Sequence, residues 1–278
     1  MVEIYWRLRE IVFALARSLF LLGLRATPHL TGKLRPLGAR GGTVVLSGGE
    51  RGEIPPRSFW LGYAATGEDY IAGGRADMEA ILALLARHHV PQPRVVLDLG
   101  CAAGRMTRHF PRSEGSEIWG ADIRAAHIAW CQRNLPELNF VTVSTAPHLP
   151  FEDGHFDFAM GASVFTHITD LADAWLLELR RVLKPGGHLY LTLHDKVSAR
   201  DMQAAPGTTA ARLKRLDRRG RLAGADMVFF DNDPASQVFY DRDYISRKWS
   251  RWMDLVAYEE RFHAYQAAML LRKRGPEG

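Results

Sequence analysis

A chain of 278 residues can form one large domain, or a core domain with a smaller appendage, and it can bury a sizeable core. Hydrophobic residues make up 47% and charged residues 24%, which is ordinary for a globular protein and excludes a low-complexity chain. The net charge of +5 is compatible with acidic substrates, nucleic acid or anionic lipid, and it selects none of them. The two cysteines, Cys101 and Cys131, have neither metal-ligand spacing nor a disulfide framework, so a reducing cytoplasm is the expected location.

Residues 1–26 have apolar side chains at near-helical spacing together with several arginines, which predicts a basic helix. Its densest apolar part, from Ile11 to Leu24, is too short to span a bilayer and has Arg17 in its middle. Two interpretations stay open. The helix packs within the protein or in a homodimer, or it lies on an anionic membrane, which would place the protein at the inner membrane surface.

The next segment, residues 27–58, contains many glycines and prolines, so we expect an irregular linker or a small hairpin around Thr43–Leu46. Apolar residues from Asp77 to His88 then recur with a helical period, and a proline-rich stretch ends that helix. We therefore divide the chain into residues 1–93, with the N-terminal helix, linker and capping helices, and a core of residues 94–278.

The core begins with a short apolar strand that is followed by a turn of small residues. Val95–Leu99 is typical of a strand covered on both faces, and Asp98 lies at its carboxyl end. A carboxylate before a glycine-rich turn is typical of a nucleotide site, although an ordinary strand–helix turn gives the same pattern. We expect a helix to begin at Arg105 with its N-terminus facing the ligand. The small residues, which let a ligand approach the backbone closely, are Gly100, Ala102 and Gly104.

Strands and helices alternate after this turn, which predicts a parallel sheet in an α/β domain. Two late strands with a short connection predict an antiparallel pair at the sheet edge. The expected strands are residues 117–122, 138–143, 156–160, 188–193, 255–258 and 266–271, and the expected helices are residues 123–134, 171–183 and 240–252.

Residues 197–237 interrupt this alternation and contain a basic run from Arg212 to Arg221 with few apolar partners. The segment is either a solvated insertion or a lid that contacts an acidic substrate. We expect the choice of substrate to depend on this insertion and on residues 27–74, the least regular parts of the chain.

In an open parallel sheet, ligands bind beyond the carboxyl ends of the strands, where the strand order reverses. Asp98 and Asp122 lie at two such ends. Asp122, about twenty residues after the turn, can accept two hydrogen bonds from a ribose diol. These positions predict a nucleoside ligand. Other residues at expected strand ends are Thr145–Pro147, Ala162–Val164, His167 and His194.

The pattern Asp98-x-Gly100-x-Ala102-x-Gly104 resembles the first motif of the class I S-adenosylmethionine-dependent methyltransferases. Two further segments resemble that family, and their order and spacing are more specific than the turn. The resemblance covers residues 94–195 and implies a Rossmann-like, doubly wound, mainly parallel seven-stranded sheet with an antiparallel last strand pair. The two segments are Leu149–Asp157 and Leu179–Gly187, and Ser163–His167 looks like a bacterial branch linked to glycan or secondary-metabolite assembly.

The resemblance implies S-adenosylmethionine as the cofactor, S-adenosylhomocysteine as its product, and no metal. It implies that Asp98 contacts the ammonium group of the cofactor and that Asp122 binds the ribose. Ala102 departs from the family's usual middle glycine, and Ser144–His148 lacks the acid that many relatives place near the adenine. The remaining implied cofactor contacts are Tyr70, Gly100, Cys101, Ala102, Gly104, Ile123, Thr145, Ala146, Pro147, Ala162 and Ser163.

A sulfonium methyl group is already activated, so such an enzyme supplies positioning and sometimes a base. An oxygen nucleophile must lose a proton, and histidine suits that role, so we expect His167 and His194 to be catalytic. The predicted function is O-methylation of a small-molecule or glycan hydroxyl. The alternatives are N- or C-methylation, a nicotinamide-dependent oxidoreductase and a non-catalytic cofactor-binding protein. Nucleic acid is disfavoured as a substrate because the basic run lacks interleaved aromatic residues.

Overall fold

The structure is a computed structural model that describes residues 41–45, 51–204, 208–220, 225–230 and 236–275. Residues from Gly41 to Gly278 form one compact unit. The helix expected at residues 1–26 lies outside the described residues, so both interpretations of it stay predictions. Within the described ranges, no helix is both long and apolar enough to cross a membrane.

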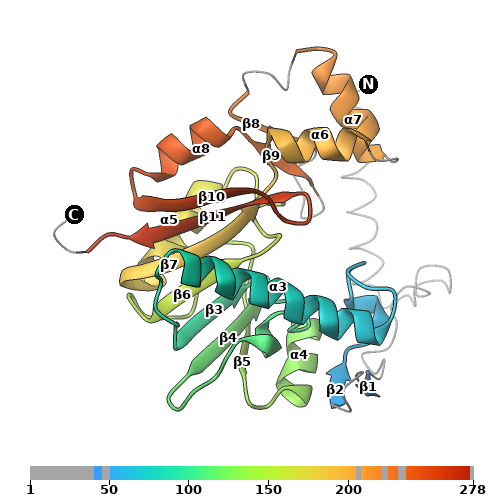
Figure 1. Ribbon diagram of the computed structural model, residues 1–278, viewed down its shortest axis with the longest axis vertical. Helices are drawn as coiled ribbons and strands as arrows, with labels where there is room; N and C mark the ends of the chain where they lie inside the picture. Colours follow the sequence, from blue (N-terminus) through green and yellow to red (C-terminus); the bar gives the residue numbers. More distant parts are fainter. Residues whose placement is uncertain (1–40, 46–50, 205–207, 221–224, 231–235, 276–278) are drawn as a thin grey trace, which may run out of the picture. The chain divides into compact units, whose positions relative to one another are not determined.

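The centre of this unit is a seven-stranded sheet (Figure 1). Its strands are β3 (Val95–Leu99), β4 (Glu117–Asp122), β5 (Asn139–Thr142), β6 (Phe156–Gly161), β7 (Leu183–Leu193), β10 (Met253–His263) and β11 (Gln266–Lys273). Their order is β10-β11-β7-β6-β3-β4-β5. Strands β3 to β7 pair in parallel, whereas β11 is antiparallel to both β7 and β10. The predicted fold class and the antiparallel last pair are confirmed.

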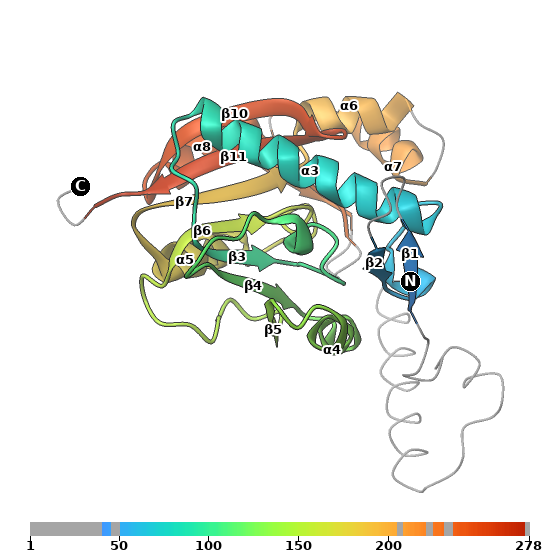
Figure 2. The same cartoon turned by 60° about the horizontal axis from the view of Figure 1, so that its bottom comes forward.

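Helices pack on both faces of the sheet, and α3 lies across the strands in both views (Figures 1 and 2). The helices are α3 (Gly67–Arg87), α4 (Ala125–Asn134), α5 (Ala172–Val182) and α8 (Arg242–Trp249). Val96 of β3 is fully buried in the hydrophobic cluster that contains Met78 of α3, and Leu97 is fully buried in the cluster that contains Leu176 of α5. Burial of both faces explains the continuous apolar run of β3.

Two short antiparallel strands and a single helical turn precede α3. The strands are β1 (Gly42–Val45) and β2 (Arg51–Ile54), and their pairing agrees with the small hairpin predicted near Thr43. The turn is the 3-10 helix η1 (Arg57–Phe59). Trp60 follows it and donates a hydrogen bond from Nε1 to the Pro55 carbonyl oxygen at 2.8 Å, which fixes the chain before α3.

Helix α3 begins at Gly67 rather than at Asp77 because a capping box starts it. The Thr66 hydroxyl accepts a hydrogen bond from Asp69 N at 3.1 Å, and the Asp69 carboxylate accepts one from Thr66 N at 3.1 Å. The pair Gly73–Gly74 lowers the helix propensity of the first turns, which is why the sequence pattern indicated a shorter helix.

Gly74 lies where α3 crosses the turn that follows β3. A Cβ at Gly74 would lie 2.2 Å from the Arg105 carbonyl oxygen, whereas a Cβ at Gly73 would lie 3.7 Å from Arg105 Nη1. We expect Gly74→Ala to lower the free energy of unfolding by about 1–3 kcal/mol, because two backbones must separate. The matched control Gly73→Ala should raise it by up to about 1 kcal/mol through helix propensity. Urea denaturation measures both changes, and equal effects would contradict the close backbone contact.

The turn after β3 does not open the helix that the sequence suggested. It forms only the 3-10 helix η2 (Thr107–His109), after which Phe110 is extended with ψ at 130°. Pro111 accounts for the difference, because the helical region is disfavoured for a residue that precedes proline. The prediction of a helix beginning at Arg105 is therefore wrong.

The insertion between residues 197 and 237 contains regular structure in its described part. The elements are α6 (Lys196–Ala204), α7 (Thr208–Asp217) and β8 (Met227–Phe229), and β8 pairs with β9 (Val238–Tyr240). Leu213 of α7 is fully buried with Ala199 and Phe239, whereas Lys214 and Arg215 are exposed. The first part of the basic run is thus the solvent side of a packed helix.

Candidate functional site

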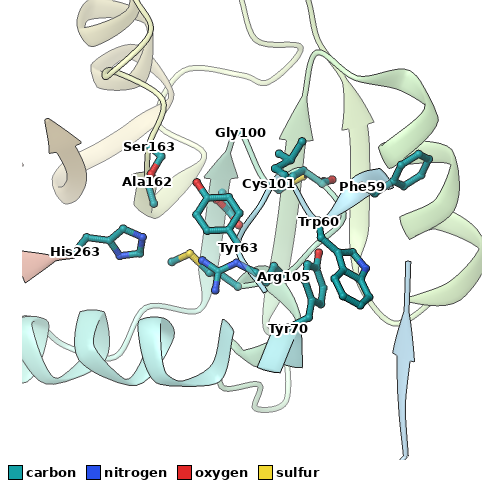
Figure 3. Close-up of a pocket in the computed structure, with 14 residues that line it drawn as sticks. Phe59, Trp60, Tyr63, Tyr70, Gly100, Cys101, Arg105, Ala162, Ser163 and His263 are labelled. Carbon is teal, nitrogen blue, oxygen red and sulfur yellow. Dashed lines mark hydrogen bonds between the residues drawn. The ribbon is translucent and has the colours of Figure 1, made fainter. Parts of the chain in front are cut away.

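A cleft of about 420 Å³ opens beyond the carboxyl ends of β3 and β6 (Figure 3). The strand order reverses at this point, because β3 has β4 on one side and β6 on the other. Open α/β sheets bind their ligands at such a position. The predicted site residues that line the cleft are Tyr70, Asp98, Gly100, Cys101, Ala102, Ala162 and Ser163.

Asp122, at the end of β4, holds the glycine-rich turn in place. Its Oδ2 accepts a hydrogen bond from Ala102 N and its Oδ1 accepts one from Arg124 N, both at 2.8 Å. Ala102 and Gly100 have φ angles of 48° and 77°, and a Cβ at Gly100 would lie 2.3 Å from Val164 Cγ2. The turn therefore requires glycine at position 100, whereas position 102 accommodates alanine.

Asp98 is only 4% exposed and lines the cleft. Its Oδ2 accepts a hydrogen bond from Thr107 Oγ1 at 2.6 Å. Burial raises the pKa of the Asp98 carboxyl to about 7; the Thr107 hydrogen bond opposes this rise and the charge of Asp122 adds to it. Such a carboxyl can bind a cationic group by giving up its proton, so Asp98 suits the ammonium end of a ligand.

Aromatic side chains from the segment before α3 form one wall of the cleft (Figure 3). Trp60 stacks on Tyr70 with ring centroids 5.5 Å apart, and the Tyr63 ring lies 4.5 Å from the guanidinium carbon of Arg105. Tyr70 is buried in the core and also lines the cleft, and its contact with a cofactor stays a prediction. Leu61 and Tyr63 are 45% and 47% exposed, which gives the cleft an apolar rim.

Arg108 ties the glycine-rich turn to this wall. Its Nε donates a hydrogen bond to the Gly104 carbonyl oxygen at 2.9 Å, and its Nη2 donates one to the Ala103 carbonyl oxygen at 3.1 Å. Its Nη1 donates to the Glu53 carbonyl oxygen in β2, and the guanidinium lies 6.0 Å from the Tyr70 ring. One half-buried cation thus joins the turn, β2 and α3.

Other predicted cofactor contacts lie outside the described lining of the cleft. Gly104 packs inward, where a Cβ would lie 2.9 Å from Leu135 Cδ1. Ile123 is 45% exposed and directly follows Asp122 at the end of β4. Because β4 and β5 continue the sheet beside β3, this surface lies along the same edge as the cleft. The remaining predicted contacts on it, after β5, are Thr145, Ala146 and Pro147, of which the first two are exposed.

The two predicted catalytic histidines are not part of the cleft lining as far as the structure describes the chain. His194 is 1% exposed and lies between the rings of Phe239 and Tyr265, with centroids 5.1 and 5.5 Å away. Burial lowers the pKa of His194 to about 4. His167 Nδ1 lies 2.7 Å from the Ser236 carbonyl oxygen. Their catalytic role stays a prediction.

A charged cluster beside the cleft was not predicted from the sequence; it is formed by Arg105, Asp77 of α3 and His263 at the end of β10. Arg105 Nη2 lies 2.6 Å from Asp77 Oδ2, and His263 Nδ1 lies 3.8 Å from Asp77 Oδ1. No local spacing could reveal this cluster, since its members come from three distant segments. The other missed lining residues are Met106 and the run Phe59, Trp60, Leu61 and Tyr63, whose density of aromatic residues was a usable signal.

Metal-dependent and nicotinamide-dependent chemistry would each need its own set of side chains. Within the described residues, no group of three or more His, Cys, Asp and Glu side chains could hold a metal ion. Tyr244 and Lys248 have the Tyr-x-x-x-Lys spacing expected of one class of nicotinamide-dependent oxidoreductase. Lys248 Nζ donates a hydrogen bond to the Tyr244 hydroxyl at 2.7 Å and pairs with Asp173 Oδ2 at 2.6 Å, but neither Tyr244 nor Lys248 is among the described residues that line the cleft.

The sequence of the core is similar to known methyltransferases. Residues 97–191 match the family described as methyltransferase domain. Phthiotriol/phenolphthiotriol dimycocerosates methyltransferase 1 of Mycobacterium ulcerans (strain Agy99) is 32% identical over 152 residues, which are 53% of this chain and 55% of that protein. A ubiquinone/menaquinone biosynthesis C-methyltransferase of Burkholderia cenocepacia (strain HI2424) is 34% identical over 110 residues, which are 37% of this chain and 44% of that protein. The chain spans about half the length of these curated relatives.

Solved structures share the fold at low sequence identity. A protein from Pyrococcus horikoshii OT3 gives a TM-score of 0.52 at 20% identity, over 72% of this chain and 91% of that chain. Magnesium protoporphyrin IX methyltransferase from Synechocystis PCC 6803, solved with bound S-adenosylhomocysteine, gives a TM-score of 0.50 at 16% identity. The match covers 76% of this chain and 89% of that chain. The sheet order, the cleft at the end of β3 and the matched segment agree with one another. Residues 97–191 of this chain are therefore similar to the class I S-adenosylmethionine-dependent methyltransferases.

Proposed function

We propose that this chain is an S-adenosylmethionine-dependent methyltransferase that methylates a hydroxyl group of a small molecule. The observation that carries the proposal is the pair of carboxylates around the glycine-rich turn. Asp98 faces the cleft with its raised pKa, and Asp122 fixes the turn through Ala102 N. These two groups suit the ammonium and the ribose of the cofactor, and the exposed Ile123 offers an apolar surface to the adenine.

The rim of the cleft favours an acceptor with an apolar or aromatic body over a free sugar. Leu61 and Tyr63 line the cleft and are 45% and 47% exposed, so an apolar ligand that covered them would remove apolar surface from water. The names of the curated relatives point the same way, since one acts on dimycocerosates and the other serves ubiquinone and menaquinone biosynthesis. The second of those relatives is a C-methyltransferase, so methylation at carbon is the second candidate.

Calorimetry tests cofactor binding directly. We expect the purified chain to bind S-adenosylmethionine and S-adenosylhomocysteine without added metal, because the cleft offers a carboxylate for the ammonium and small residues beside the methionine part. NAD should give no heat, since neither Tyr244 nor Lys248 reaches the described cleft lining. Binding of NAD with no response to either adenosyl ligand would overturn the proposal.

A panel of acceptors then tests the transfer. S-adenosylmethionine labelled with carbon-13 in the methyl group is offered with phenols that carry apolar substituents and with free monosaccharides. We expect label on the phenols, and the carbon-13 chemical shift separates an oxygen-bound methyl group from a carbon-bound one. Label at carbon would favour the second candidate, and label on the sugars alone would contradict the apolar acceptor.

A further inference from the structure

Among the histidines in the described part of the chain, His263 is the one that lines the cleft. It ends β10, so the edge of the sheet carries it to the site. Figure 3 shows its ring beside Ala162 and Ser163, with Arg105 between it and Trp60. The Ser163 hydroxyl is held there by Gln266, whose Nε2 donates to it at 3.0 Å. A hydroxyl ligand at this end of the cleft would find polar partners within an otherwise apolar site.

Asp77 orients this imidazole. One carboxylate oxygen, Oδ2, is fixed by Arg105 Nη2 at 2.6 Å, which leaves Oδ1 facing His263 Nδ1 at 3.8 Å. At this distance the two atoms are not hydrogen-bonded, but a small rotation would bring them within hydrogen-bond distance. A carboxylate beside Nδ1 favours the tautomer with its proton on that atom, so Nε2 is left as the acceptor.

The charges around His263 suit a base. Its side chain is 10% exposed, and burial lowers its pKa below the ordinary value, with the carboxylate of Asp77 opposing the shift and the charge of Arg105 adding to it. Asp77 comes from α3, Arg105 from the turn after β3, and Tyr190 of β7 also faces Asp77. The imidazole is therefore neutral near pH 7 and can accept a proton, and Asp77 would then stabilise the imidazolium.

We propose that His263, oriented by Asp77, is the proton acceptor for the hydroxyl that is methylated. The proposal rests on the function proposed above. The hydroxyl oxygen forms a bond to the methyl carbon while the bond from that carbon to sulfur breaks, and the sulfur keeps the bonding electrons. The hydroxyl proton passes to His263 Nε2. The positive charge lost from the sulfonium thus appears on the imidazolium, beside the Asp77 carboxylate.

The first test needs no acceptor and no cofactor. The pKa of the His263 imidazole is measured by NMR titration, with His263→Gln used to assign the resonance. We expect a value below 6.5, and a still lower one in Asp77→Asn, because that variant removes the carboxylate that favours the charged ring. An unchanged or higher pKa in Asp77→Asn would contradict the orienting role.

The second test is kinetic and uses the phenol that takes up label. His263→Ala should lower kcat by about 100-fold or more, as expected for loss of a general base, without weakening S-adenosylhomocysteine binding. With S-adenosylmethionine saturating, so that the titration of Asp98 does not enter, the fall of kcat/KM for the phenol at low pH should disappear with it. His155→Ala is the matched control, since His155 contacts Glu117 at 3.1 Å and is not in the described cleft lining.

The outcomes separate this proposal from the proposed function. Normal turnover by His263→Ala, or loss of S-adenosylhomocysteine binding as its main defect, would overturn the role of His263 and leave the methyltransferase assignment standing. If the fall of kcat/KM at low pH disappeared in His167→Ala or His194→Ala but persisted in His263→Ala, the general base would be one of those two histidines instead. Failure of the unaltered chain to bind S-adenosylhomocysteine would overturn the proposed function itself.

Discussion

Asp122→Ala is expected to weaken S-adenosylhomocysteine binding by at least about 100-fold. The carboxylate already accepts hydrogen bonds from Ala102 N and Arg124 N, each at 2.8 Å. A carboxylate can accept about four hydrogen bonds, so two sites remain for the ribose hydroxyls. Each charge-assisted hydrogen bond contributes about 1.5–3 kcal/mol, and the loss of two, together with release of the turn, accounts for the expected factor.

Calorimetry at constant pH measures this loss, and thermal unfolding checks that the variant stays folded. Asp254→Ala is the matched control: it also removes one acid, but Asp254 pairs with Arg272 and Arg274 away from the described lining of the cleft. Its affinity should equal that of the parent. Unchanged affinity in Asp122→Ala would mean that the ribose is bound elsewhere.

The pH dependence of cofactor binding should follow Asp98. In the unliganded protein its carboxyl has a pKa of about 7, so it is largely protonated at pH 6. A bound ammonium group favours the carboxylate, lowers this pKa, and drives release of the proton. The affinity for S-adenosylhomocysteine should therefore rise as the pH rises from 6 towards 7 and level off above about 8.

Calorimetry in two buffers of different ionisation enthalpy counts the released proton at pH 6. Asp98→Asn should bind more weakly and show neither the proton release nor the rise with pH. Proton uptake on binding, or an unaltered pH dependence in Asp98→Asn, would show that another group titrates.

The same shift has a consequence for stability. Because the folded pKa of Asp98 is raised above the ordinary value of 3.8, the folded protein binds more protons than the unfolded chain between these two values. The contribution of Asp98 to stability is thus fully present below pH 3.8 and is lost as the pH rises through about 7. Asparagine at position 98 does not titrate, so the stability of Asp98→Asn relative to the parent should increase as the pH rises.

The sheet was predictable because its signals are local. The apolar run before Asp98 and the one before Asp122 each need burial on both faces, and β3 and β4 form there. The glycine-rich turn was also predictable, because its small residues are adjacent in the sequence. The structure explains the glycine at position 100, since its φ angle is positive and Val164 leaves no room for a side chain. The two carboxylates follow directly from these strands.

The rest of the site depends on contacts between distant segments. The helix was predicted to begin at Asp77, whereas it begins at Gly67, and Gly74 lets it touch the Arg105 backbone. Asp77 and His263 come together only because α3 packs on the sheet that contains β10. The spacing of residues in the sequence does not indicate this contact. His167 and His194 were chosen for their places after strands, but the direction of a side chain depends on its neighbours.

The link that Arg108 makes between the turn, β2 and α3 also bears on the thermodynamics of ligand entry. The turn carbonyl groups and the Tyr70 ring share the half-buried guanidinium of Arg108, so folding has already restricted their motion. A preorganised wall loses little conformational entropy when a ligand arrives. Conversely, a substitution that loosens this wall reduces folding stability and ligand affinity together, because both draw on the same ordered contacts.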